Sequence, residues 1–295
     1  MVAGEASGDL LAAHLIGALR RHLPDAEFVG IGGPKMQREG FQAWWPSEKL
    51  AVRGYAEVLR HYREIAGIRR RLKRRLLAER PDVFIGVDAP DFNLWLERRL
   101  KARGIPAIHY VSPSVWAWRA GRIRKIARSV NHLLALFPFE SALYSDQGLP
   151  VTYVGHPLAD VVPLDVSRQA ARQRLEVESA QPLFALLPGS RQSELQYMAD
   201  LYVATAARLY ERFPGAVFLV PLISRETRQM FEAAMWRHGA QELPFKLLFG
   251  HAQDALAACD AALVASGTAA LEAALFRAPM VIAYRMSPWS WPILR

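Results

Sequence analysis

Short apolar runs alternate with longer segments of helical period along the whole chain, and this alternation constrains the fold more than any other feature. Buried strands of a parallel sheet read as such runs, and parallel strands need crossover connections, which are usually helices. The sequence therefore predicts an α/β fold with doubly wound parallel sheets. The predicted strands are 28–31, 83–87, 107–111, 133–136 and 151–154, followed by 183–187, 217–220, 261–264 and 280–283.

The rhythm of strands and helices breaks near Pro157 and Pro163, and restarts after them. The chain has 295 residues, about twice the common size of one domain. We therefore predict two facing doubly wound, Rossmann-like domains, residues 1–163 and 164–295. Ligands of open α/β sheets bind outside the carboxyl ends of the strands, so functional residues are expected after strands, in a cleft between the domains.

Both ends of the chain suggest that it is truncated. The loop 4–9 resembles a turn from a strand into a helix, yet only three residues precede it, so we expect the first strand to be missing. At the other end, the segment that opens at Met286 stops at Arg295, directly after a predicted strand. The second domain is therefore expected to be incomplete.

Charge and cysteine content narrow the function class. Residues 1–150 hold 24 basic and 15 acidic side chains and residues 151–295 hold 13 of each, so the net charge of +9 lies in the first half. The one cysteine, Cys259, excludes a disulfide framework and a thiolate metal site. No apolar run approaches the roughly 20 residues of a membrane span, and no secretory signal opens the sequence, which favours the cytoplasm.

One loop of the second half, Gly189, Ser190 and Arg191, has features of a phosphate site. It follows a predicted strand and enters a helix, so its amides and the helix dipole suit a diphosphate. The Arg191 guanidinium suits a forked pair with phosphate oxygens. A capped turn with a solvated arginine is the structural alternative.

A second loop, Ser266, Gly267 and Thr268, repeats this design after the strand 261–264. Glu272 follows one helical turn later, on the face that suits ribose hydroxyls. An exposed helix carboxylate is the alternative for Glu272. Two such loops in one domain favour a nucleotide diphosphate, although neither has the spacing of the dinucleotide fingerprint or of a P-loop.

In the first half, Asp88 ends the most apolar predicted strand, which places it at the lip of the predicted cleft. A carboxylate there suits a general base toward a hydroxyl nucleophile. Asp91 is better explained as a helix N-cap. Glu5 and Ser7, in the loop 4–9, are expected to reach the same cleft.

Ser112, Trp116 and Trp118 follow the strand 107–111. Indole rings beside the cation Arg119 suit a wall that binds a sugar or an apolar group, and ordinary packing is the alternative. His109 has no partner at metal-ligand spacing and is interpreted as structural. We predict no metal site.

The segment 61–80 predicts a basic amphipathic helix. Its arginines and lysine cluster at 69–71 and 73–75, while Ile65, Ile68, Leu72 and Leu76 recur at helical spacing. Such a helix suits contact with an anionic bilayer, and a solvated cationic face is the alternative. Binding to RNA is a further alternative, but it would leave both phosphate loops without a role.

Five segments together resemble lipid-A-disaccharide synthases in order and spacing. The resemblance runs from Met1 to Arg295 and is most specific at 110–119. The segments are 4–9 (GEASGD), 87–93 (VDAPDFN), 109–119 (HYVSPSVWAWR), 187–191 (LPGSR) and 265–272 (ASGTAALE).

The resemblance implies an inverting glycosyltransferase of the two-domain GT-B architecture. Such an enzyme joins UDP-2,3-diacylglucosamine to 2,3-diacylglucosamine 1-phosphate (lipid X), forming a β-1,6 disaccharide and UDP without a metal or cofactor. It implies Asp88 as the general base, in an acceptor domain that faces the membrane, and Arg191 as the donor-phosphate arginine of the UDP-sugar domain. The matching UDP-binding set is Gly189, Ser190, Ser266, Gly267, Thr268 and Glu272.

The resemblance also implies peripheral association with the cytoplasmic face of the inner membrane and no nucleic-acid partner, and it leaves oligomer formation open. Family members carry a strand before the Gly4 loop and a substantial segment after Arg295, so truncation is the departure here. Two alternatives stay open: a UDP-sugar epimerase of the same fold and a fragment without catalytic activity.

Overall fold

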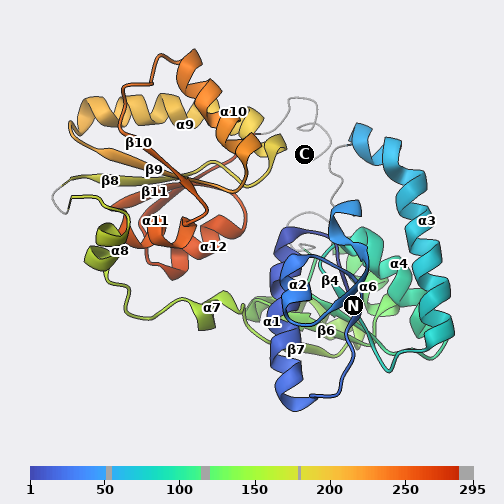
Figure 1. Ribbon diagram of the computed structural model, residues 1–295. Helices are drawn as coiled ribbons and strands as arrows, with labels where there is room; N and C mark the ends of the chain where they lie inside the picture. The colour runs from blue at the N-terminus through green and yellow to red at the C-terminus, as the bar shows by residue number, and fades with distance from the viewer. Residues whose placement is uncertain (51–54, 114–119, 179–180, 286–295) are drawn as a thin grey trace. The chain divides into compact units, whose positions relative to one another are not determined.

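The computed structural model describes residues 1–50, 55–113, 120–178 and 181–285, and the chain divides into two compact units, Met1–Pro157 and Leu158–Arg295. Each unit is built on one parallel sheet with helices on both faces (Figure 1). The predicted doubly wound α/β fold is confirmed in each unit.

The first unit holds a seven-stranded parallel sheet in the order β3-β2-β1-β4-β5-β6-β7. The chain adds strands outwards from β1 to β3, returns to the centre at β4, and then adds strands in the opposite direction. The strand order therefore reverses between β1 and β4. The strands are β1 (Val2–Ala3), β2 (Val29–Gly32), β3 (Gln42–Pro46), β4 (Phe84–Val87), β5 (Ala107–Tyr110), β6 (His132–Ala135) and β7 (Val151–Tyr153).

The expectation that the first strand would be missing is wrong. Val2 and Ala3 form β1, which pairs with β2 on one side and β4 on the other, and both side chains are fully buried. A strand of two residues carries no periodicity, which is why the pattern of apolar runs does not reveal it. Its central position between two strands supplies the hydrogen bonds that hold it.

Helices cover both faces of the first sheet (Figure 1). On one face, α1 (Ala6–His22) and α2 (Pro34–Arg38) pack against β1, β4 and β5. On the other, α3 (Tyr55–Glu79), α4 (Pro90–Lys101) and α6 (Ile123–Ser129) bury their apolar sides. The part of this unit that the structure describes also contains the 3-10 helices η1 (Ser47–Lys49), η2 (Ala120–Arg122) and η3 (Pro138–Gln147).

The second unit holds a five-stranded parallel sheet in the order β10-β9-β8-β11-β12. The chain runs from β8 outwards to β10 and then returns to β11 on the other side of β8. The strand order therefore reverses between β8 and β11. The strands are β8 (Leu183–Leu187), β9 (Val217–Leu222), β10 (Phe245–Phe249), β11 (Ala261–Ala265) and β12 (Met280–Ala283).

The helices of the second unit also form two layers (Figure 1). On one face, α9 (Gln192–Arg212) and α10 (Arg225–Arg237) cover a core that includes the aromatic cluster of Phe184, Phe218, Phe231 and Phe245. On the other lie α8 (Arg168–Arg174), α11 (Ala252–Ala258) and α12 (Thr268–Leu275). The short helix α7 (Leu158–Val161) opens the unit.

Candidate functional site

The loops that follow β1 and β4 lie side by side at the carboxyl edge of the first sheet. A Cβ added to Gly4 would lie 3.2 Å from the Cβ of Ala89, and one added to Gly8 would lie 3.7 Å from the Cβ of Asp88. The structure therefore brings Glu5, at the N-cap of α1, and Ser7, in its first turn, next to the Asp88 loop. The strand order reverses at this point, where open α/β sheets bind ligands.

Asp88 sits on a strained turn between β4 and α4. Asp88 (φ 53°) and Ala89 (φ 43°) are both left-handed, which is uncommon outside glycine and clusters at functional sites. The Asp88 amide donates to the Tyr110 carbonyl (2.9 Å), and the Asn93 side-chain amide donates to the Asp88 carbonyl (2.8 Å). These contacts hold the backbone of the turn, and the side chain of Asp88 is partly exposed.

Two nearby aspartates are tied to helices. The N-cap of α4 is Ala89, so the predicted N-cap at Asp91 is wrong, and Asp91 instead pairs with Arg122 from the first turn of the helix. Asp9 is buried, and its carboxylate accepts from the amides of Gly33 (2.9 Å) and Lys35 (3.0 Å) at the start of α2. These contacts account for both carboxylates.

A buried polar pair lies beneath the Asp88 turn. His109 Nδ1 and Glu97 Oε1 are 2.6 Å apart, and both side chains are completely shielded from solvent. Gly86 makes room for the pair, because a Cβ there would lie 2.1 Å from Glu97 Oε1. His109, interpreted from the sequence as structural, lies in the interior, where it pairs with Glu97, a partner that the sequence analysis did not identify. A glycine inside an apolar strand was the available signal.

Burial and mutual attraction act in opposite directions on this pair. Burial raises the pKa of Glu97 above its usual range, and the positive charge of His109 opposes that rise. Burial is also the largest influence on His109 and lowers its pKa, but attraction to Glu97, the hydrogen bond to Glu97 and attraction to Asp88 outweigh it. The pKa of His109 is therefore raised, which favours the imidazolium form.

Ser112 does not lie where the sequence predicts. Its side chain is buried, and its hydroxyl oxygen lies 2.9 Å from the Tyr144 hydroxyl, so it forms part of the interior rather than a cleft wall. For a polar residue two positions after a strand, the sequence does not indicate whether the side chain points into the core or toward solvent. Trp116 and Trp118 lie outside the described residues.

In the second unit, the two predicted phosphate loops are neighbours. The loop with Gly189, Ser190 and Arg191 follows β8, and the loop with Ser266, Gly267 and Thr268 follows β11, which pairs directly with β8. Both loops therefore lie at the carboxyl edge, where the strand order reverses.

The loop after β11 leads directly into α12. Ser266, Gly267 and Thr268 are exposed, Gly267 is the N-cap with φ 149°, and Glu272 is half-buried one turn into the helix. The Ser266 amide donates to the Ala283 carbonyl at 3.2 Å. This positive φ favours glycine, and the later amides of the helix start are the ones that suit an anion.

Glu194 occupies the amide groups of the other loop, which sequence reasoning missed. Its Oε2 accepts from the amides of Ser190 (3.1 Å) and Arg191 (3.3 Å), and its Oε1 pairs with the Arg191 guanidinium at 2.8 Å. A Cβ on Gly189 (φ 120°) would lie 2.7 Å from Glu194 Oε2, so glycine is needed there. These amides therefore have the geometry to hold an anionic oxygen.

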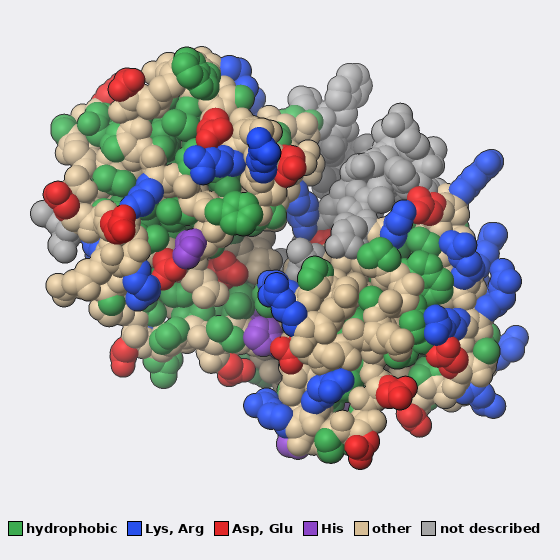
Figure 2. All heavy atoms as spheres, viewed as in Figure 1, with side chains coloured by type: hydrophobic (Ala, Val, Ile, Leu, Met, Phe, Trp, Pro, Cys, Tyr) green, Lys and Arg blue, Asp and Glu red, His purple; other side chains and the backbone are tan. Residues whose placement is uncertain are grey.

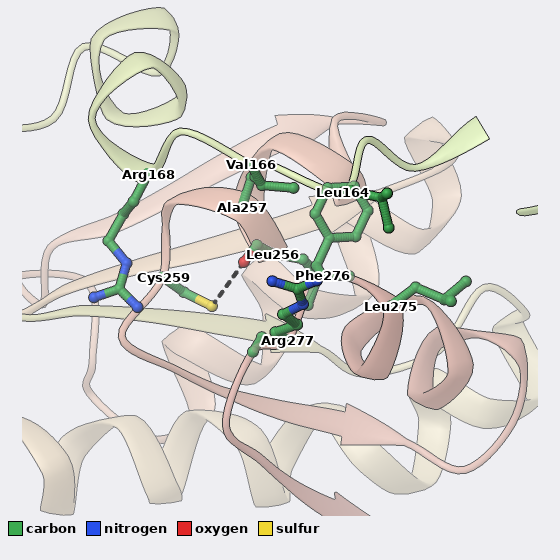
Figure 3. A pocket seen from close by; sticks show the side chains of 10 residues that line it. Leu164, Val166, Arg168, Leu256, Ala257, Cys259, Leu275, Phe276 and Arg277 are labelled. Carbon is green, nitrogen blue, oxygen red and sulfur yellow. Dashed lines mark hydrogen bonds between the residues drawn. The ribbon is translucent and has the colours of Figure 1, made fainter. Parts of the chain in front are cut away.

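A cavity of about 170 Å³ in the second unit lies away from these loops. Figure 3 shows Leu164, Arg168 and Phe276 lining it, with Cys259 and Arg277. Cys259 precedes β11 and Arg277 precedes β12, so the cavity lies at the amino ends of these strands. That is the opposite edge of the sheet from Arg191 and Ser266.

Within residues 1–50, 55–113, 120–178 and 181–285, no group of three or more His, Cys, Asp or Glu side chains is arranged to hold a metal ion.

Comparison with known proteins adds a family to this geometry. A sequence profile of the lipid-A-disaccharide synthetase family matches residues 1–295. The lipid-A-disaccharide synthase of Dechloromonas aromatica (strain RCB) is 63% identical over 296 residues, covering 100% of this chain and 78% of its own length. That of Azoarcus sp. (strain BH72) is 62% identical over 295 residues, covering 100% and 75%.

Solved structures show a related fold at low sequence identity. The crystal structure of UDP-GlcNAc 2-epimerase from Neisseria meningitidis bound to UDP-GlcNAc matches with a TM-score of 0.65 and 13% identity, covering 95% of this chain and 80% of that one. At this identity the likeness shows the fold alone, two Rossmann-like α/β units of the GT-B type.

Proposed function

The chain belongs to the lipid-A-disaccharide synthetase family, and on that premise we propose that it joins UDP-2,3-diacylglucosamine to 2,3-diacylglucosamine 1-phosphate, with Asp88 as the base. It is a glycosyltransferase of lipid A biosynthesis, as predicted. The epimerase alternative is not favoured, because the UDP-GlcNAc 2-epimerase structures share the fold at 12% to 14% identity, whereas the synthases share more than half of the sequence.

One structural observation supports the assignment of residues. Each sheet reverses its strand order once, and the predicted residues follow the strands at that reversal: Asp88 after β4 in the first unit, Arg191 after β8 and Ser266 after β11 in the second. Ligands of doubly wound sheets bind at such points. In this proposal the first unit binds the acceptor and the second holds the UDP-sugar. The groove expected between the units stays a prediction.

The proposed reaction is a direct displacement with inversion. The Asp88 carboxylate takes the proton of the acceptor 6-hydroxyl, while the oxygen of that hydroxyl forms a bond to the anomeric carbon of the donor. The bond from that carbon to the UDP oxygen breaks, and the electron pair leaves with UDP. Arg191 and the amides of the two loops stabilise the negative charge that develops on the diphosphate. Glu272 is assigned to the ribose hydroxyls.

A product assay tests this function. We expect the chain, incubated with UDP-diacylglucosamine and diacylglucosamine 1-phosphate, to release UDP and form the disaccharide in equal amounts, detected by mass spectrometry. With the donor alone, it should neither release UDP nor convert the sugar. Conversion of UDP-diacylglucosamine to an epimer without the acceptor would contradict the proposal.

The proposed contact with the membrane involves the helix α3, but its apolar face is not the part that makes the contact. Ile68, Leu72 and Leu76 are buried in the core of the first unit, so the apolar face of α3 is not free to enter a bilayer. The basic face remains exposed, and Figure 2 shows lysine and arginine side chains gathered along α3. No helix in the described ranges combines the length and apolar character that crossing a bilayer takes.

We propose that this basic face binds the anionic cytoplasmic surface of the inner membrane by charge. Arg70, Arg71 and Arg74 are exposed on it. Arg69 lies over Trp95 (4.3 Å to the ring centroid), and Arg75, which is also exposed, lies over Trp44 (3.7 Å). The stacked arginines stiffen the face, and the exposed ones are available to lipid headgroups. Each such charge contributes about 1 kcal/mol near an anionic surface.

Vesicle sedimentation checks the membrane proposal. We expect binding to phosphatidylglycerol vesicles, little binding to phosphatidylcholine vesicles, and loss of binding as salt is raised, because salt screens exposed charges. Changing Arg70, Arg71 and Arg74 together to Gln should weaken binding about 100-fold or more, from the contribution per charge.

The control for this experiment changes the same number of exposed arginines in the second unit, Arg208, Arg212 and Arg225, to Gln. Equal losses in the two triple variants would show that net charge acts rather than the α3 face. Binding that is indifferent to lipid charge would contradict the proposal.

A further inference from the structure

Burying the Glu97–His109 pair between α4 and β5 costs free energy, and packing alone does not require the pair. Both side chains are fully shielded, and two charges lose their hydration there. Among the described residues, neither His109 Nε2 nor Glu97 Oε2 has a hydrogen-bond partner. Apolar side chains of similar volume would serve packing as well or better. The pair is therefore better explained by a function than by packing.

The pair lies next to the turn that carries Asp88. In the sheet, His109 is the Cα partner of Gly86, two residues before Asp88, and Glu97 reaches the pair from α4. Asn93, one turn before Glu97 on α4 and fully buried, donates to the carbonyls of Asp88 (2.8 Å) and Val2 (3.3 Å). The buried polar groups of α4 thus link β1, β4 and β5 directly beneath the candidate base.

Charge also connects the pair to Asp88. The attraction of Asp88 is one of the influences that raise the pKa of His109, beside those of Glu97. The other titratable groups on the surrounding elements include Glu5, at the N-cap of α1. Three more, Asp9, Asp91 and Tyr110, have contacts or burial that explain their state. Asp9 is bound by the amides of α2, Asp91 pairs with Arg122, and burial raises the pKa of Tyr110 to about 12, so Tyr110 is neutral.

We propose that Glu97 and His109 are positioning residues for Asp88: Glu97 holds His109 as an imidazolium, and the charge of the imidazolium keeps the Asp88 carboxylate ionised for the acceptor. The inference rests on the proposed role of Asp88 as the base. A general base must be unprotonated before it accepts the proton, and the Asp88 side chain is partly buried. A neighbouring cation opposes the protonation that such burial favours.

The test replaces both members by amides, Glu97→Gln with His109→Gln, because removing one charge alone leaves the other buried and unpaired. Near neutral pH we expect kcat to fall about 10- to 100-fold, less than the 10²- to 10⁴-fold that a general base contributes. The KM for UDP-diacylglucosamine should stay within about twofold, since the second unit is untouched.

The pH–rate profile separates positioning from mere support of the fold. Because the base loses a neighbouring positive charge, the acidic limb of kcat/KM should move to higher pH by about one unit, and activity should partly recover above neutral pH. A structural defect would lower activity at every pH alike. Ser129→Ala, which removes the hydrogen bond made by another fully buried side chain of this unit, should leave the profile unchanged.

Thermal melts followed by circular dichroism first establish that the variants are folded. If the double variant is unfolded, the single variant Glu97→Gln replaces it in the kinetic measurements. Glu97→Gln keeps the volume and a hydrogen-bond acceptor but removes the anion that holds the His109 proton, so it should shift the profile in the same direction. A folded variant with parent kcat and profile, together with an inactive Asp88→Asn variant, would overturn this inference alone. An active Asp88→Asn variant would instead overturn the proposed function.

Discussion

The substitution Asp88→Asn is expected to lower kcat by about 10²- to 10⁴-fold, the usual contribution of a general base. Asn keeps the size of the side chain but cannot accept the proton of the acceptor hydroxyl at neutral pH. Asn is also well suited to the left-handed φ of 53° at this position, so the turn should persist. Steady-state kinetics with both substrates measure the effect.

UDP affinity supplies the internal check on this variant. Calorimetric titration with UDP should give a Kd within about twofold of the parent, because the assigned UDP contacts lie in the second unit. Asp91→Asn is the matched control, since Asp91 is exposed three residues away and pairs with Arg122. It should keep nearly full activity. An Asp88→Asn variant as active as the parent would remove Asp88 from the mechanism.

The parts of the site that could be predicted from sequence are those that follow long apolar strands. Asp88 and Arg191 each come after such a run, and the carboxyl edge of a parallel sheet is a general binding position, so strand prediction alone brings them into consideration. Doubly wound sheets imply a reversal of strand order, but the strands between which each reversal falls were not predicted. They depend on which strands pair, and apolar runs carry no information on pairing.

The supporting polar groups were missed for a different reason. Glu97 and His109 are twelve residues apart on a helix and a strand, and only the packing of α4 on β5 brings them together. Glu194 lies close to its loop in the sequence, but nothing in the sequence marks it as the acceptor for the amides of that loop. Contacts made by tertiary packing have no periodic signature in the sequence.

The amphipathic pattern of α3 shows a third limit. Ile68, Leu72 and Leu76 recur as they would in a helix lying on a membrane, but they also recur as they would in a helix lying on a sheet. The structure places them in the core. Periodicity identifies the apolar face of a helix, and only the fold identifies what covers it.

The substitution Arg191→Ala is expected to weaken UDP binding about 10- to 150-fold, which corresponds to the 1.5–3 kcal/mol of a hydrogen bond to a charged group. Arg191 stands at the N-cap of α9, where the guanidinium and the helix start both favour a diphosphate. Arg191→Lys keeps the charge but loses the fork, so its affinity should lie between those of the parent and the alanine variant. Calorimetric titration with UDP measures all three.

Glu194 makes this prediction sharper, because its carboxylate now holds the amides of Ser190 and Arg191 and pairs with the guanidinium. A diphosphate that uses these groups has to share them with Glu194 or displace it. Glu194→Gln retains a capping side chain but removes the competing negative charge, so UDP affinity should not fall. If Glu194→Gln loses as much UDP affinity as Arg191→Ala, the diphosphate depends on the intact Glu194–Arg191 pair. The prediction that the Arg191 guanidinium binds the diphosphate independently of Glu194 would then be wrong.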